Sequence, residues 1–286
     1  MQAVTTTKKP DRRLTVAALI SGEPTAADLW TLRKLAGAAR ELVVLQAGHG
    51  RGTPRWKRIR QLLREYGVAR TCSRLLGGIV GASVAKSNQP ILDELFDVEE
   101  LRQWWKSAGI RVVLVATLNH EECRRALTEI GPDLLVRVSG GILKPHIFSS
   151  AKMAALNIHH GQAPAIRGMW SIPWGIVEGK GNWIGATVHV IDNGIDTGAV
   201  LWRGGPQLAP GDTTVDLFFR THLLAADALA DVIEVYSKGE CPASLVTSAN
   251  EPSTYRSAPG VWAWLKLLYL GQGSRAPVLL EKARRC

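Results

Sequence analysis

Two residues in the segment Leu156-Asn157-Ile158-His159 could stabilise a developing negative charge. Asn157 and His159 are two positions apart on a strand-like stretch, so their side chains point to the same side. An amide donor beside an imidazole can act as an oxyanion-stabilising pair. A single Asn-x-His pattern is also common where the histidine has only a structural role, so this segment needs support from elsewhere in the chain.

A second polar segment, Asp192 to Gly198, follows an apolar strand-like stretch and contains Asp196. The Asp, Asn and Gly content is typical of a surface loop that contains an Asx turn. The alternative is functional: a carboxylate placed beside an imidazole fixes the tautomer and favours the imidazolium form.

A third segment runs from Arg137 to Leu143 and contains Gly140-Gly141 after a strand-like stretch. Two glycines at the end of a strand let a flat ligand approach the backbone closely. The signal is weak when it is taken alone.

The elements that must position these segments alternate between strand-like and helix-like patterns, as in a parallel sheet with helices on both faces. The strands are expected at 14–20, 41–47, 111–117, 133–139, 154–158, 184–191 and 199–203. The helices are expected at 25–36, 97–109, 121–130, 173–179 and 217–236. The predicted fold class is therefore α/β, and all three polar segments follow strands, where such folds bind ligands.

The predicted organisation is a disordered tail over 1–13, a main domain over 14–238 and a small C-terminal appendage over 239–286. Residues 48–90 interrupt the alternation and are interpreted as a basic helical insertion, with an amphipathic helix over 54–66. In the appendage, a Trp/Leu-rich helix is expected over 261–270.

The composition limits the function classes. The chain has 286 residues, of which 46% are hydrophobic and 21% charged, enough for a full core. No apolar run reaches the length of a membrane-spanning helix, and the polar N-terminus has no signal-peptide stretch, so the expected location is cytoplasmic. The four cysteines form no C-x-x-C pair, and the spacing of the histidines does not suit a metal site.

The net charge of +10 fits RNA, an acidic membrane surface or an anionic small substrate, and by itself chooses none of them. Much of the excess lies between Arg51 and Arg64. The turn Ser21-Gly22-Glu23-Pro24 after the first strand is not a G-x-G-x-x-G loop, which argues against a plain nucleotide-binding domain.

Taken together, the ordered motifs resemble the folate-dependent formyltransferase family. The matching residues are Asn157, His159 and Pro164, followed by Ile195-Asp196-Thr197-Gly198. The resemblance covers roughly residues 110–235 well and 14–47 loosely. One departure is Gly161, where relatives often have Ser, in a loop expected near the acceptor.

The resemblance implies a Rossmann-like formyltransferase fold and 10-formyltetrahydrofolate as the formyl donor, with no metal. Asn157 and a protonated His159 would stabilise the negative oxygen. Asp196 would raise the pKa of His159 and accept the proton of the acceptor amine, directly or through a water. The residues expected to bind the folate are Gly141, Ile142, Leu143, Asp192, Asn193, Gly194 and Ile195.

The expected acceptor is the amine of a small, anionic molecule, such as a nucleotide-linked amino sugar or an N-hydroxyornithine-like compound. A tRNA acceptor is not favoured, because the tRNA enzymes carry a sizeable second domain. Two alternatives stay open: a formyltetrahydrofolate hydrolase, and a catalytically idle homologue that binds RNA or membrane through its basic helix. Contact with an acidic surface through 54–66 and a homodimer also stay open.

Overall fold

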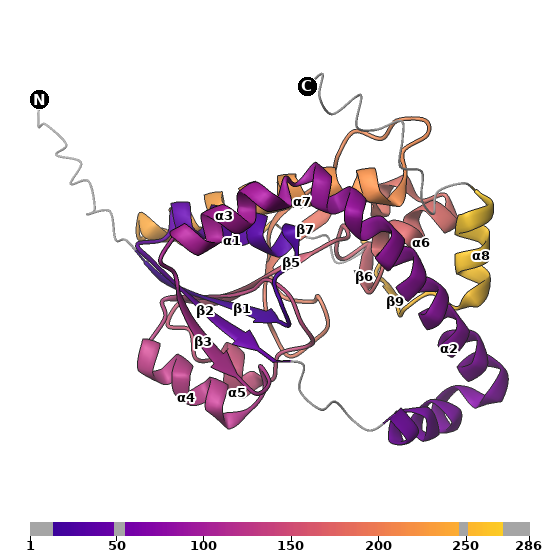
Figure 1. The fold of residues 1–286 in the computed structure, drawn as a ribbon, viewed down its shortest axis with the longest axis horizontal. Helices are drawn as coiled ribbons and strands as arrows, with labels where there is room; N and C mark the ends of the chain where they lie inside the picture. Colours follow the sequence, from indigo (N-terminus) through magenta and orange to yellow (C-terminus); the bar gives the residue numbers. More distant parts are fainter. Residues whose placement is uncertain (1–13, 49–54, 246–250, 271–286) are drawn as a thin grey trace, which may run out of the picture.

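The computed structural model describes residues 14–48, 55–245 and 251–270, so the predicted tail over 1–13 and parts of the predicted appendage lie outside the described residues. A seven-stranded sheet forms the centre, in the order β3-β2-β1-β4-β5-β7-β8 (Figure 1). Its strands are β1 Thr15–Ser21, β2 Glu41–Ala47, β3 Arg111–Val115, β4 Leu134–Arg137, β5 Ala154–His159, β7 Ala186–Val190 and β8 Val200–Gly204. The first five in this order run parallel, whereas β7 and β8 pair antiparallel.

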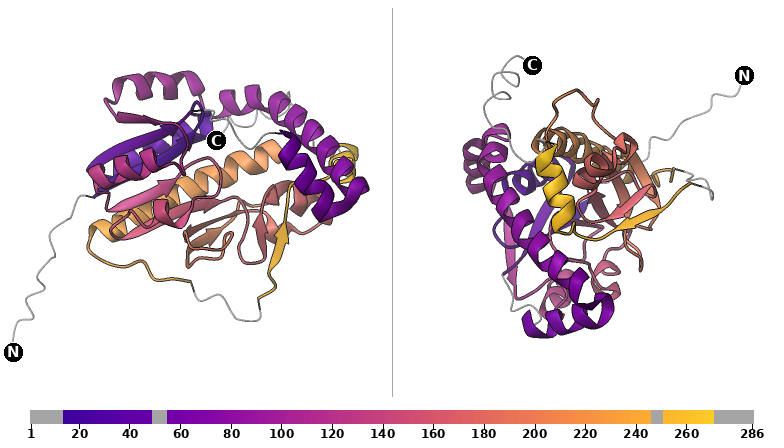
Figure 2. Two further views of the ribbon diagram at one scale, coloured as in Figure 1. Left: turned by 90° about the horizontal axis from the view of Figure 1, so that it is seen from below. Right: turned by 90° about the vertical axis from the view of Figure 1, so that its right-hand side faces the viewer.

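Successive side chains of the strands point to opposite faces of the sheet, and helices bury both faces. On β1, Val16 and Ile20 pack on one face and Ala17 and Leu19 on the other. The first face is covered by α1 Ala26–Ala38, α3 Val98–Ser107 and α7 Thr214–Ser237, and the second by α4 Glu121–Ile130 and α5 Pro145–Phe148 (Figures 1 and 2). The predicted mostly parallel sheet with helices on both faces is confirmed.

Helix α2 covers Arg55–Leu95, with a break at Gly67, whose φ of 73° interrupts the helical backbone. The sequence indicated an amphipathic helix over 54–66 and an insertion that ends at residue 90. The second half of α2 instead continues to Leu95 and lies beside α8 Val261–Tyr269 in all views (Figure 2). Glycines in α2 make this approach close, because a Cβ at Gly77 would lie 2.5 Å from the carbonyl oxygen of Pro259.

The described part of the C-terminal segment joins the main body. Strand β9 Thr254–Arg256 pairs in parallel with β6 Ile166–Gly168, which follows the Asn-x-His segment. Helix α6 Ser171–Glu178 and the short 3-10 helix η1 Gly181–Trp183 lie between β6 and β7. Within the described ranges, no helix combines the length and apolarity needed to cross a membrane.

Candidate active site

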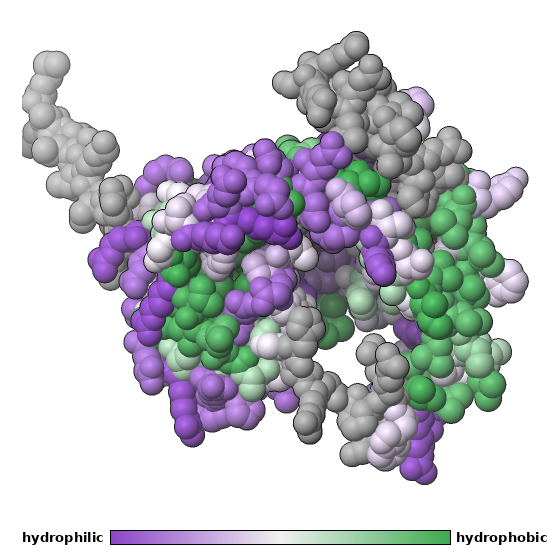
Figure 3. Space-filling view, in the orientation of Figure 1, coloured by the Kyte–Doolittle hydropathy of each residue, from purple (hydrophilic) through white to green (hydrophobic). Residues whose placement is uncertain are grey.

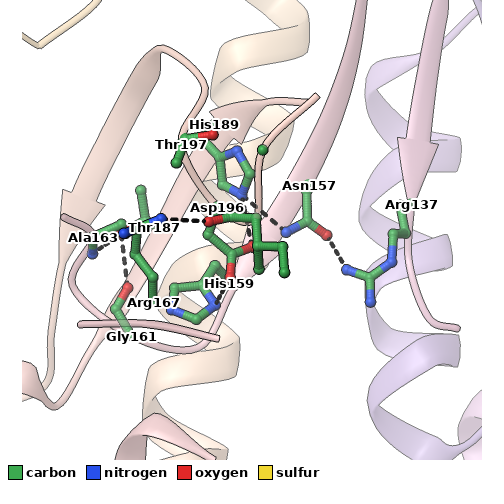
Figure 4. A network of polar contacts seen from close by, with 12 residues as sticks. Arg137, Asn157, His159, Gly161, Ala163, Arg167, Thr187, His189, Asp196 and Thr197 are labelled. Carbon is green, nitrogen blue, oxygen red and sulfur yellow. Dashed lines mark hydrogen bonds and ion pairs between the residues drawn. The ribbon is translucent and has the colours of Figure 1, made fainter. Parts of the chain in front are cut away.

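The three polar segments meet at the carboxyl ends of β4 and β5 and in the loop after β7 (Figure 4). Nδ1 of His159 lies 3.4 Å from Oδ2 of Asp196, so the two form an ion pair when the imidazole is protonated. The second carboxylate oxygen, Oδ1, lies 3.5 Å from Nε2 of His189, on the antiparallel neighbour of β5. Asn157 and His159 are buried, at 3% and 6% exposure.

Asp196 is held as an anion. Burial by itself raises its pKa, but contacts with His189 and His159 and the backbone N–H of Gly168 lower the pKa to about 2. That N–H donates to Oδ2 across 3.0 Å. The backbone of Asp196 has a φ of 51°, a left-handed conformation that Asp tolerates better than most residues. The carboxylate therefore remains charged over the whole physiological pH range.

Burial affects the protonation state of His159. Burial lowers its pKa below 6.5, although the charge of Asp196 raises it. Its Nε2 lies 3.1 Å from the carbonyl oxygen of Ile166 and 3.4 Å from the hydroxyl of Ser171. The sequence analysis predicted a protonated imidazole beside a negative oxygen, and that remains a prediction. In the free protein at neutral pH we expect the neutral form, because desolvation outweighs the attraction of one carboxylate.

Arg137 fixes the orientation of Asn157. The guanidinium can only donate, and its Nη1 lies 2.6 Å from Oδ1 of Asn157. The amide nitrogen therefore faces Nε2 of His189, at 3.0 Å, and keeps its second N–H. Nδ1 of His189 donates to the carbonyl of Val190, so Nε2 accepts from Asn157 when the ring is neutral and donates to Asp196 when it is protonated.

The loop after β5 is shaped around His159. A Cβ at Gly161 would lie 2.6 Å from both Nε2 of His159 and Oγ of Ser171, so only glycine fits without a shift. The buried hydroxyl of Thr187 donates to the carbonyl of Gly161 and accepts from the N–H of Ala163. The family pattern often has Ser where this chain has Gly161. Here the hydroxyl of Ser171, from α6, lies beside Gly161.

A buried pair of histidines lies behind the site and was not predicted. Nε2 of His160 lies 3.0 Å from Nδ1 of His222, and the two rings stack, with centroids 5.2 Å apart. Nε2 of His222 lies 2.9 Å from the carbonyl oxygen of Ala27, to which it donates, so Nδ1 accepts from His160. Burial lowers the pKa of His160 well below 6.5, and it lowers that of His222 to about 4.

This pair makes stability depend on pH. Because the folded pKa of His222 is depressed to about 4, the unfolded chain binds a proton between pH 6.5 and pH 4 that the folded chain does not. The free energy of unfolding should therefore fall by about 2 kcal/mol from this residue between pH 7 and pH 5. Urea denaturation at pH 7, 6 and 5 measures the slope, which should be shallower in His222→Gln and unchanged in His146→Gln, an exposed histidine. Equal slopes in all three proteins would contradict this account.

The site forms the floor of a cavity of about 580 Å³. Most residues predicted to bind the folate line one wall: Gly141, Ile142, Leu143, Asp192, Gly194 and Ile195. Asn193 is not among the lining residues. Asp192 accepts from the N–H of Gly194 across 3.0 Å, so the loop contains the expected Asx turn as well as Asp196.

The opposite wall was missed by the sequence analysis. It comes from the second half of α2, with Val84, Asn88 and Leu92, and from Trp264 of α8. The amide oxygen of Asn88 is buried without a hydrogen-bond partner in the described part of the chain. A buried polar atom of this kind needs an explanation. A signal in the sequence was the absence of any acidic residue between Tyr66 and Leu92, which is unusual for a solvated insertion.

No group of three or more His, Cys, Asp or Glu side chains in the described ranges is arranged so that it could hold a metal ion. The polar chemistry at the cavity floor is that of one carboxylate, two imidazoles, one amide and a buried guanidinium. This set can stabilise charge on an oxygen and accept a proton.

An α/β sheet that presents Asn157, His159 and Asp196 at its strand ends has the architecture and site that the sequence motifs predicted for the formyltransferase class. The family model for formyl transferase matches residues 85–233. Methionyl-tRNA formyltransferase from Desulfotalea psychrophila is 32% identical over 135 residues, 47% of this chain and 42% of that protein. The corresponding enzyme from Anaeromyxobacter dehalogenans is 30% identical over 139 residues, 48% of this chain and 44% of that protein. These matches thus cover less than half the length of those relatives.

Among solved structures, a sugar N-formyltransferase from Shewanella sp. has a TM-score of 0.52 at 14% identity, over 85% of this chain and 76% of that one. Phosphoribosylglycinamide formyltransferase from Anaplasma phagocytophilum has a TM-score of 0.50 at 17% identity, over 86% and 99%. The fold is shared with both. Because the family model spans more than half of the chain, this protein belongs to the formyl transferase family, as the sequence motifs predicted.

Proposed function

We propose that this protein transfers a formyl group from 10-formyltetrahydrofolate to the amine of a small acceptor. The observation that supports the proposal most directly is the contact of 3.4 Å between His159 and Asp196 at the floor of the cavity, with Asn157 on the same strand as His159. These are the residue types that the transfer requires: donors for a developing oxyanion and a carboxylate for the proton.

Asn157 would donate its free N–H to the formyl oxygen as negative charge develops there. Its other polar atoms are taken by Arg137 and His189, so the amide cannot rotate without losing both contacts. A negative charge beside His159 acts in the same direction as Asp196 and raises the pKa of the imidazole. His159 is thus neutral while the cavity is empty and favours the imidazolium form when the oxygen becomes negative.

Asp196 would accept the proton that the attacking amine loses, directly or through a water. With a pKa of about 2, it is ionised whenever an amine is a nucleophile, so it needs no prior deprotonation. The N–H of Gly168 holds Oδ2 in place, which orients the carboxylate toward His159.

The wall formed by Gly140 to Leu143 would hold the folate, which supplies the formyl group. Ile142 is 66% exposed, although it is a large apolar side chain that lines the cavity. A Cβ at Gly141 would meet nothing within 4 Å, so the backbone there has open space beside it. An apolar side chain next to bare backbone suits a flat heteroaromatic ring, which needs both contact area and backbone partners.

The acceptor would enter from the side of α2, where Asn88 lines the cavity. An amino sugar or a hydroxylated amino acid fits this proposal. The described basic side chains of the stretch 54–66, Arg60 and Arg64, do not line the cavity, so the charge argument that favoured an anionic acceptor gains no support from its described walls. The named relatives are methionyl-tRNA formyltransferases, so the assay must distinguish a tRNA acceptor from a small amine.

The test is to mix the purified protein with 10-formyltetrahydrofolate and follow the release of tetrahydrofolate with and without candidate amines. Tight folate binding with release only in the presence of an amine supports the transferase. Fast release without any acceptor would identify a hydrolase instead. No folate binding at all would rule out both activities and favour the idle homologue.

A further inference from the structure

Helix α8 is apolar on its exposed side as well as on its buried side. Trp264 and Leu267 are 2% and 0% exposed and pack against α2 and α6. On the other side of the same helix, Trp262 is 75% exposed and Tyr269 is 89% exposed. A surface helix normally presents polar residues to solvent, so the outer side of α8 needs another partner.

The apolar surface extends from α8 onto α2. Leu76 of α2 is 52% exposed and adjoins Gly77, which lies against the start of α8. Figure 3 shows the resulting apolar surface at the right-hand edge of the molecule, over α8 and the neighbouring part of α2. We call this surface the α2–α8 face. Its residues are Leu76 of α2 and Trp262, Leu265, Leu268, Tyr269 and Leu270 of the C-terminal segment.

The charged residues that α8 and the neighbouring stretch of α2 carry have one sign. Between Tyr66 and Leu92 the chain has Arg70, Arg74 and Lys86 and no Asp or Glu, and α8 contributes Lys266 and no acidic residue. A second copy of this chain would bring the same cations together, which opposes self-association through this face. An anionic lipid surface offers the complementary charge together with an apolar layer.

We propose that the α2–α8 face docks the protein on an anionic membrane surface. Leucine, tryptophan and tyrosine side chains insert at the boundary between headgroups and acyl chains, and the lysine and arginine side chains contact the headgroups. This is attachment to one leaflet. The sequence had placed such contact at 54–66, whereas the exposed apolar surface of the structure centres on α8.

The experiment is flotation of the full chain with vesicles of phosphatidylglycerol and phosphatidylcholine, and with vesicles of phosphatidylcholine alone. Binding should require the anionic lipid and weaken with salt. Trp262→Ser combined with Tyr269→Ser should lower the partition coefficient about tenfold or more, because two exposed aromatic side chains are lost. Neither residue lines the cavity, so turnover of freely dissolved substrates should be unchanged.

The matched control is Leu114→Ser combined with Leu208→Ser, which removes two exposed leucines, at 72% and 45% exposure, outside the α2–α8 face. This control should bind vesicles as the natural chain does. Equal loss in both double variants, or no loss in the first, would overturn the proposal. A chain that ignores vesicles but dimerises in sedimentation experiments, with the dimer abolished by the first double variant, would also overturn it and assign the face to a second copy.

Discussion

Asp196→Asn is expected to lower kcat by about 10³-fold, because the site loses the carboxylate beside His159 that accepts the proton of the amine. The amide oxygen of the variant can still accept from the N–H of Gly168, so the loop should keep its position. Folate affinity should therefore stay close to that of the natural chain. Stopped-flow measurement of folate binding and a steady-state assay separate the two quantities.

The control is Asp227→Asn, which removes a half-exposed carboxylate that pairs with Lys34 and does not line the cavity. Exposed ion pairs contribute little, so its kcat should equal that of the natural chain. Turnover of Asp196→Asn within a factor of about ten of the natural chain would contradict the mechanism, since general acid–base catalysis contributes at least 10²-fold.

Gly161→Ala is expected to lower kcat by about 10²-fold through a displacement of His159. The new methyl group would sit 2.6 Å from Nε2 of His159 and 2.6 Å from Oγ of Ser171. Adding Ser171→Gly removes one of these two clashes, so the double variant should recover part of the lost activity. The recovery is measured as kcat in the same assay, with folate binding as the test of a preserved fold.

Gly37→Ala is the matched glycine control, because a Cβ there meets nothing within 4 Å. It should leave kcat unchanged. If the second substitution at Ser171 makes Gly161→Ala worse, the steric account is wrong and the serine hydroxyl has a role of its own.

The strands of the central sheet could be predicted from the sequence because each of them has a clear local pattern. The strand at 41–47 and the helix at 121–130 have the predicted bounds. Thr25 and Asp97, at which two of the predicted helices begin, are the N-caps of α1 and α3. The Asn-x-His and Asp loop segments could be placed together because both follow strands of one sheet. Their ordered spacing identified the family, which the family model confirms.

What the sequence could not supply depends on contacts between distant segments. His160 and His222 are 62 residues apart, and nothing local to either indicates that they pair. The lowered pKa of His159 in the empty site could not be predicted either, because the burial that causes it depends on the whole fold. The wall formed by α2 was missed because it depends on a distant contact: Gly77 and Gly81 make room for Pro259 and Trp264 of the C-terminal segment.

Trp264 takes part in two contacts of the fold. Its ring packs α8 against Gly81, where an added Cβ would lie 2.7 Å from the ring, and the same side chain lines the cavity. A ligand that shifts this ring changes the position of α8, and thermodynamic linkage then acts in both directions by the same factor. We therefore expect the partition of the chain between water and lipid to depend on whether the cavity is filled, so that lipid attachment and substrate occupancy form a single coupled equilibrium.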